Sequence, residues 1–368
     1  MRFPEFSGEW EKCSLGEIGH TSIGLTYSPA DVVKEDGIIV LRSSNIQDGE
    51  IDYKDLVRVN KKIKDSLFTK KDDILICARN GSPRLIGKNA LISDVDAGHS
   101  YGAFMMVYRS EENPFVRQLL CTKRYFAQVG ENLGARINQI TTSDMNSFEF
   151  FFPQSKEERN KIALFLRIID ERISTQKKII EKYESLIRGL YHSTFNNPSS
   201  ILQLREVVSV VKGKQVNGEE LLEEGKYYVM NGGTEPSGYL NEYNTPADTI
   251  SISEGGNSCG YVQYNKEPFW SGGHCYSLMP KSENICYRFL YHFLKYKEND
   301  IMALRIGSGL PNIQKKDLER FEVQLPSLER QREVTTLLDA ISAKLDLEKQ
   351  LHHVWQSQKQ YLLGSLFI

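Results

Sequence analysis

A long amphipathic helix is the sequence feature that most constrains the fold of this chain. From Ile162 to Phe195, apolar residues recur every seven positions, with a second set four positions further on. Such spacing places all of them along one face of a helix. The seam consists of Ile162, Leu166, Ile169, Ile173, Gln176, Ile180, Tyr183, Ile187 and Leu190. A helix with so long an apolar seam needs a partner to cover it.

The partner lies in the same chain, because a second copy of the helix follows 172 residues later. It carries Val334, Leu338, Ile341, Leu345, Glu348, Trp355 and Leu362 in the same register. We expect the two helices to pair as an antiparallel coiled coil with approximate two-fold symmetry. Gln176 and Glu348 fall near the middle of the seam. Polar residues there either fix the register or simply face solvent, and the sequence leaves both alternatives open.

The rest of the chain also contains an internal repeat. LGEI (15–18) is echoed by LREV (204–207), Asp73 with ILICA by Asp248 with TISIS, GHSY (98–101) by GHCY (273–276), and NQITTSDM (138–145) by PNIQKKDL (311–318). Repeats of this length indicate duplicated structural units. We predict a first head at 1–154, a first long helix at 155–196, a second head at 197–327 and a second long helix at 328–368. NNPSS (196–200) is the predicted linker.

Each head combines short strands with a helix. The first head contains the β-rich runs GIIVLRS, DDILICA, KNALISD and FMMVYR, separated by turn signals. One helical stretch follows in each half, PFVRQLLCTKRYFAQV in the first and CYRFLYHFLKYKEN in the second. This order predicts the α+β class, as two similar α+β heads separated by the two long helices.

The charge balance argues against a global attraction for nucleic acid. The 368 residues include 46 Lys or Arg and 48 Asp or Glu, for a net charge of −2. A nucleic-acid partner must therefore meet a local patch. From Asp52 to Leu91 there are ten basic residues against five acidic ones. This segment, including Lys61, Lys62 and Lys64, either contacts phosphates or forms a solvated face.

Sequence motifs give no support for catalysis or for membrane insertion. The chain has no Walker A loop, GxGxxG, HExxH or NPPY-like tetrapeptide, and its six cysteines show neither zinc-finger nor CxxC spacing. GNSCG (256–260) fits GxSxG with Ser258 as nucleophile, but the strand-like YVQY follows where an elbow requires a helix. We predict no catalytic residue and no metal site. Without a signal peptide or a long apolar run, we expect a cytoplasmic protein without membrane contact.

Polar loops provide the candidate DNA-contacting residues. The loop ARNGSPRLIGK follows one Asp-led strand, and SEGGNSCGYVQY follows the other. In the major groove, Arg side chains hydrogen-bond guanine, Asn side chains hydrogen-bond adenine, and Glu carboxylates accept a hydrogen bond from cytosine. GHSY and GHCY, expected at equivalent places, add a His and a Tyr each, and GARINQI and GSGLPNI form a second loop in each head. For each residue the alternative is a structural role without a ligand. The candidates are Arg79, Asn80, Ser82, Arg84, Lys88, His99, Tyr101, Arg136, Asn138, Asn231, Glu254, Asn257, Ser258, Tyr261, His274, Tyr276, Ser308 and Asn312.

The order of head, helix, head and helix resembles the specificity subunit of type I restriction-modification enzymes over nearly the whole chain. The likeness is carried by RFPEFSGEW followed by LGEI, by SGGHCY, by GSGLPNIQKKDL running into LPSLERQREV, and by the tandem helices. Where such proteins often show PPLEEQ before a helix, this chain has PQSKEER and PSLERQ.

The resemblance implies that each head is a target recognition domain reading one half of an asymmetric bipartite site in double-stranded DNA. The helices would set the spacing and dock two methylation subunits, which bind S-adenosylmethionine, so this chain itself would bind no cofactor. Restriction and motor subunits would join for cleavage. The alternative from another class is a non-enzymatic coiled-coil adaptor that binds protein rather than DNA.

Overall fold

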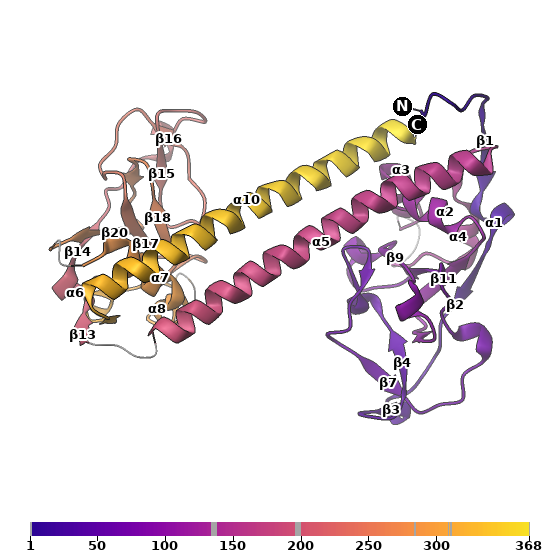
Figure 1. Cartoon of the computed structure of the whole chain (residues 1–368), viewed down its shortest axis with the longest axis horizontal. Helices are drawn as coiled ribbons and strands as arrows, with labels where there is room; N and C mark the ends of the chain where they lie inside the picture. The colour runs from indigo at the N-terminus through magenta and orange to yellow at the C-terminus, as the bar shows by residue number, and fades with distance from the viewer. Residues whose placement is uncertain are drawn as a thin grey trace. The chain divides into compact units, whose positions relative to one another are not determined.

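The chain folds into two compact units. The computed structural model describes residues 2–133, 138–195, 200–282, 285–307, 309 and 311–367. Unit 1 comprises Met1–Thr175 and Leu351–Ile368, and unit 2 comprises Gln176–Gln350. Each unit therefore holds one head together with part of each long helix (Figure 1). Residues 196–199, which form most of the predicted linker, lie outside the described residues.

The two predicted long helices are α5 (Lys156–Phe195) and α10 (Leu328–Leu366). The core of unit 1 contains Ile162 and Leu166 from the start of α5 together with Leu362 and Leu366 from the end of α10. The core of unit 2 joins the end of α5 to the start of α10. Within each unit the helices therefore pair antiparallel, as predicted. None of the helices in the described ranges is long and apolar enough to cross a membrane.

The polar pair in the seam faces inward rather than toward solvent. Gln176 and Glu348 are only 7% and 9% exposed. Nε2 of Gln176 donates to the carbonyl oxygen of Glu348 at 3.2 Å and also to its carboxylate. Lys344 pairs with the other carboxylate oxygen at 2.7 Å. The solvent-facing alternative is therefore wrong, and a slip of the helices would separate these partners inside the seam.

The head of unit 1 is built on two four-stranded sheets, ordered β2-β11-β8-β9 and β10-β4-β7-β3, with the small pairs β1-β12 and β5-β6. Its strands are β1 (Trp10–Ser14), β2 (His20–Ile23), β3 (Val32–Val33), β4 (Ile38–Leu41), β5 (Ile46–Gln47), β6 (Glu50–Ile51), β7 (Val57–Val59), β8 (Ile74–Cys77), β9 (Asn89–Leu91), β10 (Ser100–Tyr101), β11 (Met105–Arg109) and β12 (Glu149–Pro153). Its short helices are α1 (Leu15–Ile18), α2 (Asn113–Leu119), α3 (Lys123–Leu133) and α4 (Thr142–Ser147).

The single helical stretch predicted in the first head is two helices, α2 and α3. Oγ1 of Thr122 accepts a hydrogen bond from the backbone N–H of Tyr125 at 3.3 Å. This bond caps the start of α3, as threonine does at helix N-termini. The break was hidden in the sequence because the apolar spacing continues across it.

The head of unit 2 repeats this plan with sheets ordered β14-β20-β17-β18, β16-β15-β19 and β13-β21. Its strands are β13 (Ser200–Gln203), β14 (Val208–Lys212), β15 (Tyr227–Met230), β16 (Tyr239–Leu240), β17 (Thr249–Ser253), β18 (Val262–Asn265), β19 (Trp270–Ser271), β20 (Cys275–Pro280) and β21 (Glu322–Leu325). Its helices are α6 (Leu204–Val207), α7 (Tyr287–Tyr296), α8 (Glu298–Met302) and α9 (Lys315–Glu319).

Backbone geometry confirms the internal repeat. Asp72 before β8 and Asp248 before β17 both have positive φ, 64° and 57°, so the counterpart of Asp248 is Asp72 and the predicted pairing with Asp73 is wrong by one residue. Gly24 and Gly213 occupy equivalent crossings, where an added Cβ would lie 2.3 Å and 2.2 Å from the carbonyl oxygens of Gly102 and Gly272. Both crossings exclude any side chain, so the two heads share one backbone scaffold at these points.

The proposed equivalence of GHSY and GHCY is wrong. Ser100 and Tyr101 form β10, which pairs parallel with β4, whereas Cys275 and Tyr276 begin β20, which pairs antiparallel with β14 and β17. The counterpart of β20 in unit 1 is β11, which pairs with β2 and β8. The two tetrapeptides are therefore similar in sequence but not equivalent in structure, because they lie on strands of different sheets.

A buried histidine ties the head of unit 2 to its long helices. His292 on α7 is 1% exposed. Its Nε2 lies 2.8 Å from Oδ1 of Asp339 on α10, and its Nδ1 lies 3.1 Å from the hydroxyl of Tyr191 on α5. Arg288 also pairs with Asp339. Burial lowers the pKa of His292 more than the neighbouring Asp339 raises it.

We expect acidification to destabilise the protein through His292. The folded-state pKa is lowered, so the unfolded chain binds the proton more readily and the stability is lost as the pH falls through about 6.5. Denaturant unfolding should show about 1 kcal/mol less stability at pH 5.5 than at pH 7.5 from this group. The variant His292→Gln should lack that component. An identical pH dependence in both proteins would contradict the assignment.

Candidate nucleic-acid interface

Six of the residues predicted in the second head line one cavity of about 700 Å³. It opens where β17 ends and where the turns after β15 and β19 meet the loop before α9. The predicted residues in its wall are Asn231, Glu254, Asn257, Ser258, His274 and Asn312. The others are Lys212, Gly232, Gly233, Ser237, Gly255, Gly256 and Pro311. Segments up to 100 residues apart in the chain are thus brought into a single polar recess.

Glu254 is the charged centre of this cavity. It is 8% exposed, and its Oε1 accepts from Nζ of Lys212 at 2.7 Å and from the hydroxyl of Tyr276 at 3.1 Å. Its Oε2 lies 3.9 Å from Nδ1 of His274. Burial raises the pKa of Tyr276, and the negative charge of the neighbouring Glu254 carboxylate raises it further. Lys212 and Tyr276 therefore hold the carboxylate in one orientation.

The rim of the cavity is set by backbone contacts. Oδ1 of Asn231 accepts from the backbone N–H of His274 at 3.1 Å, which fixes the turn but leaves the His274 side chain 62% exposed. Oδ1 of Asn312 accepts from Nε2 of Gln314 at 3.0 Å. Asn257 is exposed and Ser258 half-buried in the loop after Glu254. Asn231, His274, Asn257 and Asn312 are thus accessible to a ligand.

Two predicted tyrosines of the second head do not belong to this surface. Tyr276 is 2% exposed, and its hydroxyl oxygen also lies 3.0 Å from the carbonyl oxygen of Ile313, so this carbonyl and Glu254 compete for its single proton. It cannot be a surface contact, so its prediction as a DNA-contacting residue is corrected to a structural role. Tyr261 is half-buried, with Nζ of Lys295 4.1 Å from its ring centroid, and does not line the cavity.

In the first head, the loop after β8 presents an arginine. Arg79 is exposed, with its guanidinium 5.1 Å from the ring centroid of Phe104. Asn80 is committed to the loop, because its Nδ2 donates to Oγ of Ser43 at 2.9 Å and its Oδ1 accepts from the N–H of Ser82 at 3.0 Å. Arg79 therefore presents an exposed guanidinium to a ligand, and the hydrogen bonds of Asn80 hold the loop that carries it.

The remaining predicted loop residues of the first head surround this turn. Arg84 is exposed in the short 3-10 turn Pro83–Leu85. Lys88 is half-buried and reaches Oε1 of Gln47 at 3.5 Å. Asn138 has positive φ, and its Nδ2 donates to the carbonyl of Gly81 at 3.0 Å. Two predicted residues, Arg136 and Ser308, lie outside the described residues.

His99 and Tyr101 lie away from this loop. Tyr101 is fully buried at 0% exposure in the core between the sheets, so its prediction as a DNA contact is wrong. It lies on β10, an edge strand of the second sheet, and packs into that core. His99 is half-buried, packs edge-on against Tyr53 at 5.7 Å, and has its pKa lowered mainly by burial.

The first head contains a cavity of about 800 Å³ that was not predicted from the sequence. Its polar residues include Arg42, Ser43 and Ser44 after β4, and Phe104 lies opposite. The turn at Arg42 is the counterpart of the turn at Asn231, because Gly102 N–H donates to the carbonyl of Leu41 just as Gly272 N–H donates to that of Met230. The repeat offset between LGEI and LREV, 189 residues, would have identified Arg42.

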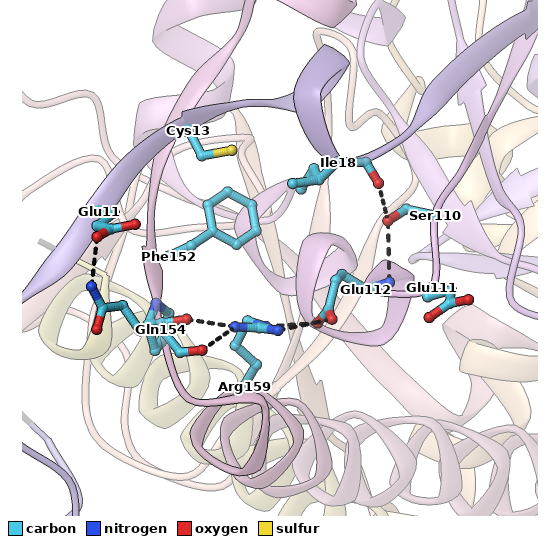
Figure 2. A pocket seen from close by; sticks show the side chains of 10 residues that line it. Glu11, Cys13, Ile18, Ser110, Glu111, Glu112, Phe152, Gln154 and Arg159 are labelled. Carbon is cyan, nitrogen blue, oxygen red and sulfur yellow. Dashed lines mark hydrogen bonds and ion pairs between the residues drawn. The ribbon is translucent and has the colours of Figure 1, made fainter.

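A third cavity, of about 520 Å³, lies where the head of unit 1 meets the start of α5 (Figure 2). Arg159 on α5 donates to both carboxylate oxygens of Glu112, at 2.8 and 2.9 Å, and to the carbonyl of Gln154 at 3.0 Å. This pairing lowers the pKa of Glu112. The arginine fastens the helix to the head, which is a structural task. Within the described ranges, no group of three or more potential metal-ligating His, Cys, Asp or Glu side chains occurs.

Comparison with known proteins identifies the family. The model described as the type I restriction modification DNA specificity domain matches residues 7–185 and again residues 197–354. A protein of Mycoplasma genitalium named as a type I specificity subunit is 29% identical over 232 residues, which cover 59% of this chain and 61% of that protein. The EcoKI specificity subunit of Escherichia coli is 27% identical over 180 residues, covering 45% of this chain and 39% of that protein.

The similarity to these relatives spans about two fifths to three fifths of their own lengths. A crystal structure of a type I restriction-modification S subunit from M. genitalium superposes with a TM-score of 0.75 at 22% identity, covering 100% of this chain and 99% of that one. The fold of the two repeated heads and long helices is therefore shared. With both halves matched by the family model, the chain belongs to the family of type I restriction-modification DNA specificity domains.

Proposed function

We propose that this chain is the sequence-recognising, non-catalytic subunit of a type I restriction-modification system. Each head reads one half of an asymmetric bipartite site in double-stranded DNA. The long helices set the spacing and dock two methylation subunits, which bind S-adenosylmethionine, and restriction and motor subunits join for cleavage. The chain itself binds no cofactor and works in the cytoplasm, where the DNA is.

The observation that carries this proposal is one scaffold with two different sets of side chains. At equivalent backbone positions, unit 1 has Arg42 and Phe104 where unit 2 has Asn231 and His274. Ala78 and Glu254 are likewise equivalent, since their N–H groups donate to the carbonyls of Phe104 and His274, both at 2.9 Å. A shared backbone that carries different side chains at these equivalent positions suits two heads that read two different sequences.

The exposed side chains have the chemistry of base recognition. Arg79 can donate to O6 and N7 of guanine, and Asn257 can pair with adenine. Lys62 and Lys64 are exposed on the first head and suit phosphate contacts, which position a protein without specifying sequence. With a net charge of −2, the lone chain should bind DNA weakly and depend on its partners for affinity.

Docking of partners is supported by an apolar stripe on α10. Leu347, Leu351, Val354 and Tyr361 are 59%, 43%, 57% and 66% exposed. Their spacing of three, four and seven residues places them on one face of the helix. Lys178 and Arg188 are exposed on α5, where Lys177 is half-buried, and they add charge to the outer surface of that helix. An exposed stripe of this kind is typical of a helix that binds another protein.

Methylome sequencing with and without this chain tests the proposal. Deleting the chain from cells that contain its methylation subunits should abolish methylation at one bipartite motif, because those subunits have no other source of sequence recognition. Restoring the chain from a plasmid should restore that motif. An unchanged methylome would contradict the proposal and favour the adaptor, in which the same stripe binds protein and the heads do not read DNA.

A further inference from the structure

The cavity of unit 2 contains a buried carboxylate oxygen that accepts no hydrogen bond from the described residues. Oε1 of Glu254 already accepts from Lys212 and Tyr276. Oε2 is shielded and has no hydrogen bond within the described part of the chain, since Nδ1 of His274 is 3.9 Å away. An ionised carboxylate accepts on both oxygens and donates on neither. Oε2 therefore needs a hydrogen-bond donor that the described head does not supply.

The walls of the cavity leave room for such a donor. Gly255 and Gly256 follow Glu254, and at Gly256 an added Cβ would meet nothing within 4 Å. Two hydrogen bonds fix the backbone of Glu254. Its N–H donates to the carbonyl of His274 at 2.9 Å, and its carbonyl accepts from the N–H of Ile313 at 2.8 Å. The His274 side chain is 62% exposed, and Asn231 holds only its backbone, so its ring can turn aside. A flat donor group can thus reach a carboxylate that does not move.

We propose that Oε2 of Glu254 accepts a hydrogen bond from the exocyclic amine of a base, N4 of cytosine or N6 of adenine, in the half-site read by the second head. This inference rests on the proposed function. In the major groove these two amines are donors, whereas O6 of guanine and O4 of thymine are acceptors that a carboxylate repels. Glu254 is thus a specificity-determining residue. Its counterpart in unit 1 is Ala78, so the first head lacks this reader.

Removing the amine from the DNA tests the contact. The full chain, assembled with its methylation subunits, is titrated with duplexes in which one base at a time of the second half-site lacks its amine: 2-pyrimidinone for cytosine, or purine for adenine. At one position we expect the wild-type complex to lose about tenfold or more in affinity. The base analogue that produces the loss identifies which of the two amines is read. No loss at any position would overturn the proposal.

The variant Glu254→Gln assigns the loss to this residue. Its carbonyl oxygen can still accept from Lys212 and Tyr276, but its amide no longer repels guanine O6 or thymine O4. The variant should bind the intact and amine-free duplexes within about threefold of one another, and its methylome should accept more than one base at that position. The matched control is Glu223→Gln, an exposed carboxylate of the same head, which should keep wild-type selectivity. If Glu254→Gln discriminates as the wild type does, the proposal is wrong.

A shorter acid separates a folding defect from a loss of reading. Glu254→Asp keeps the charge and withdraws the oxygen, so it should weaken discrimination at the same position while leaving the first half-site unchanged. Should Glu254→Gln not fold, unaltered discrimination by Glu254→Asp overturns the proposal. These results are distinct from a failure of the proposed function. If the wild-type chain specifies no bipartite motif, the function fails; if it specifies one that the Glu254 variants leave unaltered, only this inference fails.

Discussion

Exchanging residues 1–152 for the first head of another specificity subunit should replace one half of the recognised sequence and leave the other half unchanged. Methylation at the native motif should disappear completely, and a hybrid motif should take its place. The reason is that the Arg42 cavity and the exposed Arg79 belong to unit 1 alone, and the Glu254 cavity belongs to unit 2 alone. Methylome sequencing of cells expressing the exchanged chain is the measurement.

The exchange must preserve the contacts that seat the first head on its helices. Phe115 and Trp10 pack against Phe367 with ring centroids 5.6 and 6.2 Å apart, and Glu112 holds Arg159. An incoming head should therefore keep these contact residues. The matched control is the reciprocal exchange of residues 197–327, which should alter the opposite half-site. A single exchange that changes both halves would contradict independent reading by the two heads.

The long helices could be predicted from sequence because their signal is purely periodic. Apolar residues at seven-residue spacing require one helical face, whatever else the chain does. The antiparallel pairing followed from finding the same pattern again 172 residues later, whereas the burial of Gln176 against Glu348 is decided only by the structure. Strands β8 and β17 were also predictable, because a run rich in apolar and β-branched residues follows an aspartate in both heads.

The candidate site was only partly predictable, because its walls come from turns distant in sequence. Glu254 and Asn257 were found since they follow a recognisable strand. Arg42 was missed, since it belongs to the turn after β4, which meets the loop after β8 only through contacts between separate sheets, such as the hydrogen bond from Asn80 to Ser43. Tyr101 and Tyr276 were misplaced because polarity alone does not reveal burial: both hydroxyls lie inside the heads. Cross-sheet packing decides this, and no local pattern encodes it.

A buried ion pair at the start of β8 should dominate the stability of unit 1. Asp73 is 4% exposed and accepts from Nε of Arg109 at 3.0 Å, from its second guanidinium nitrogen at 3.0 Å, and from the N–H of Lys70 at 2.8 Å. Asp73→Asn removes the negative charge and leaves the Arg109 cation in a site where only 15% of its side chain is exposed. We expect a loss of about 3 kcal/mol in the free energy of unfolding, measured by urea denaturation.

Two further variants separate the ion pair from its surroundings. Lys71 and Asp94 form a neighbouring pair that is 58% and 73% exposed, so Asp94→Asn should produce no measurable change. Replacing both buried partners, as Asp73→Leu with Arg109→Met, should recover much of the loss, because the cost of the single change is mainly the unpaired buried charge. A loss below about 1 kcal/mol for Asp73→Asn would mean that the carbonyls of Ser66 and Phe68, which also accept from Arg109, suffice to hold the cation. Because β8 leads directly into Arg79, the destabilised variant should also lose selectivity at the first half-site before the second.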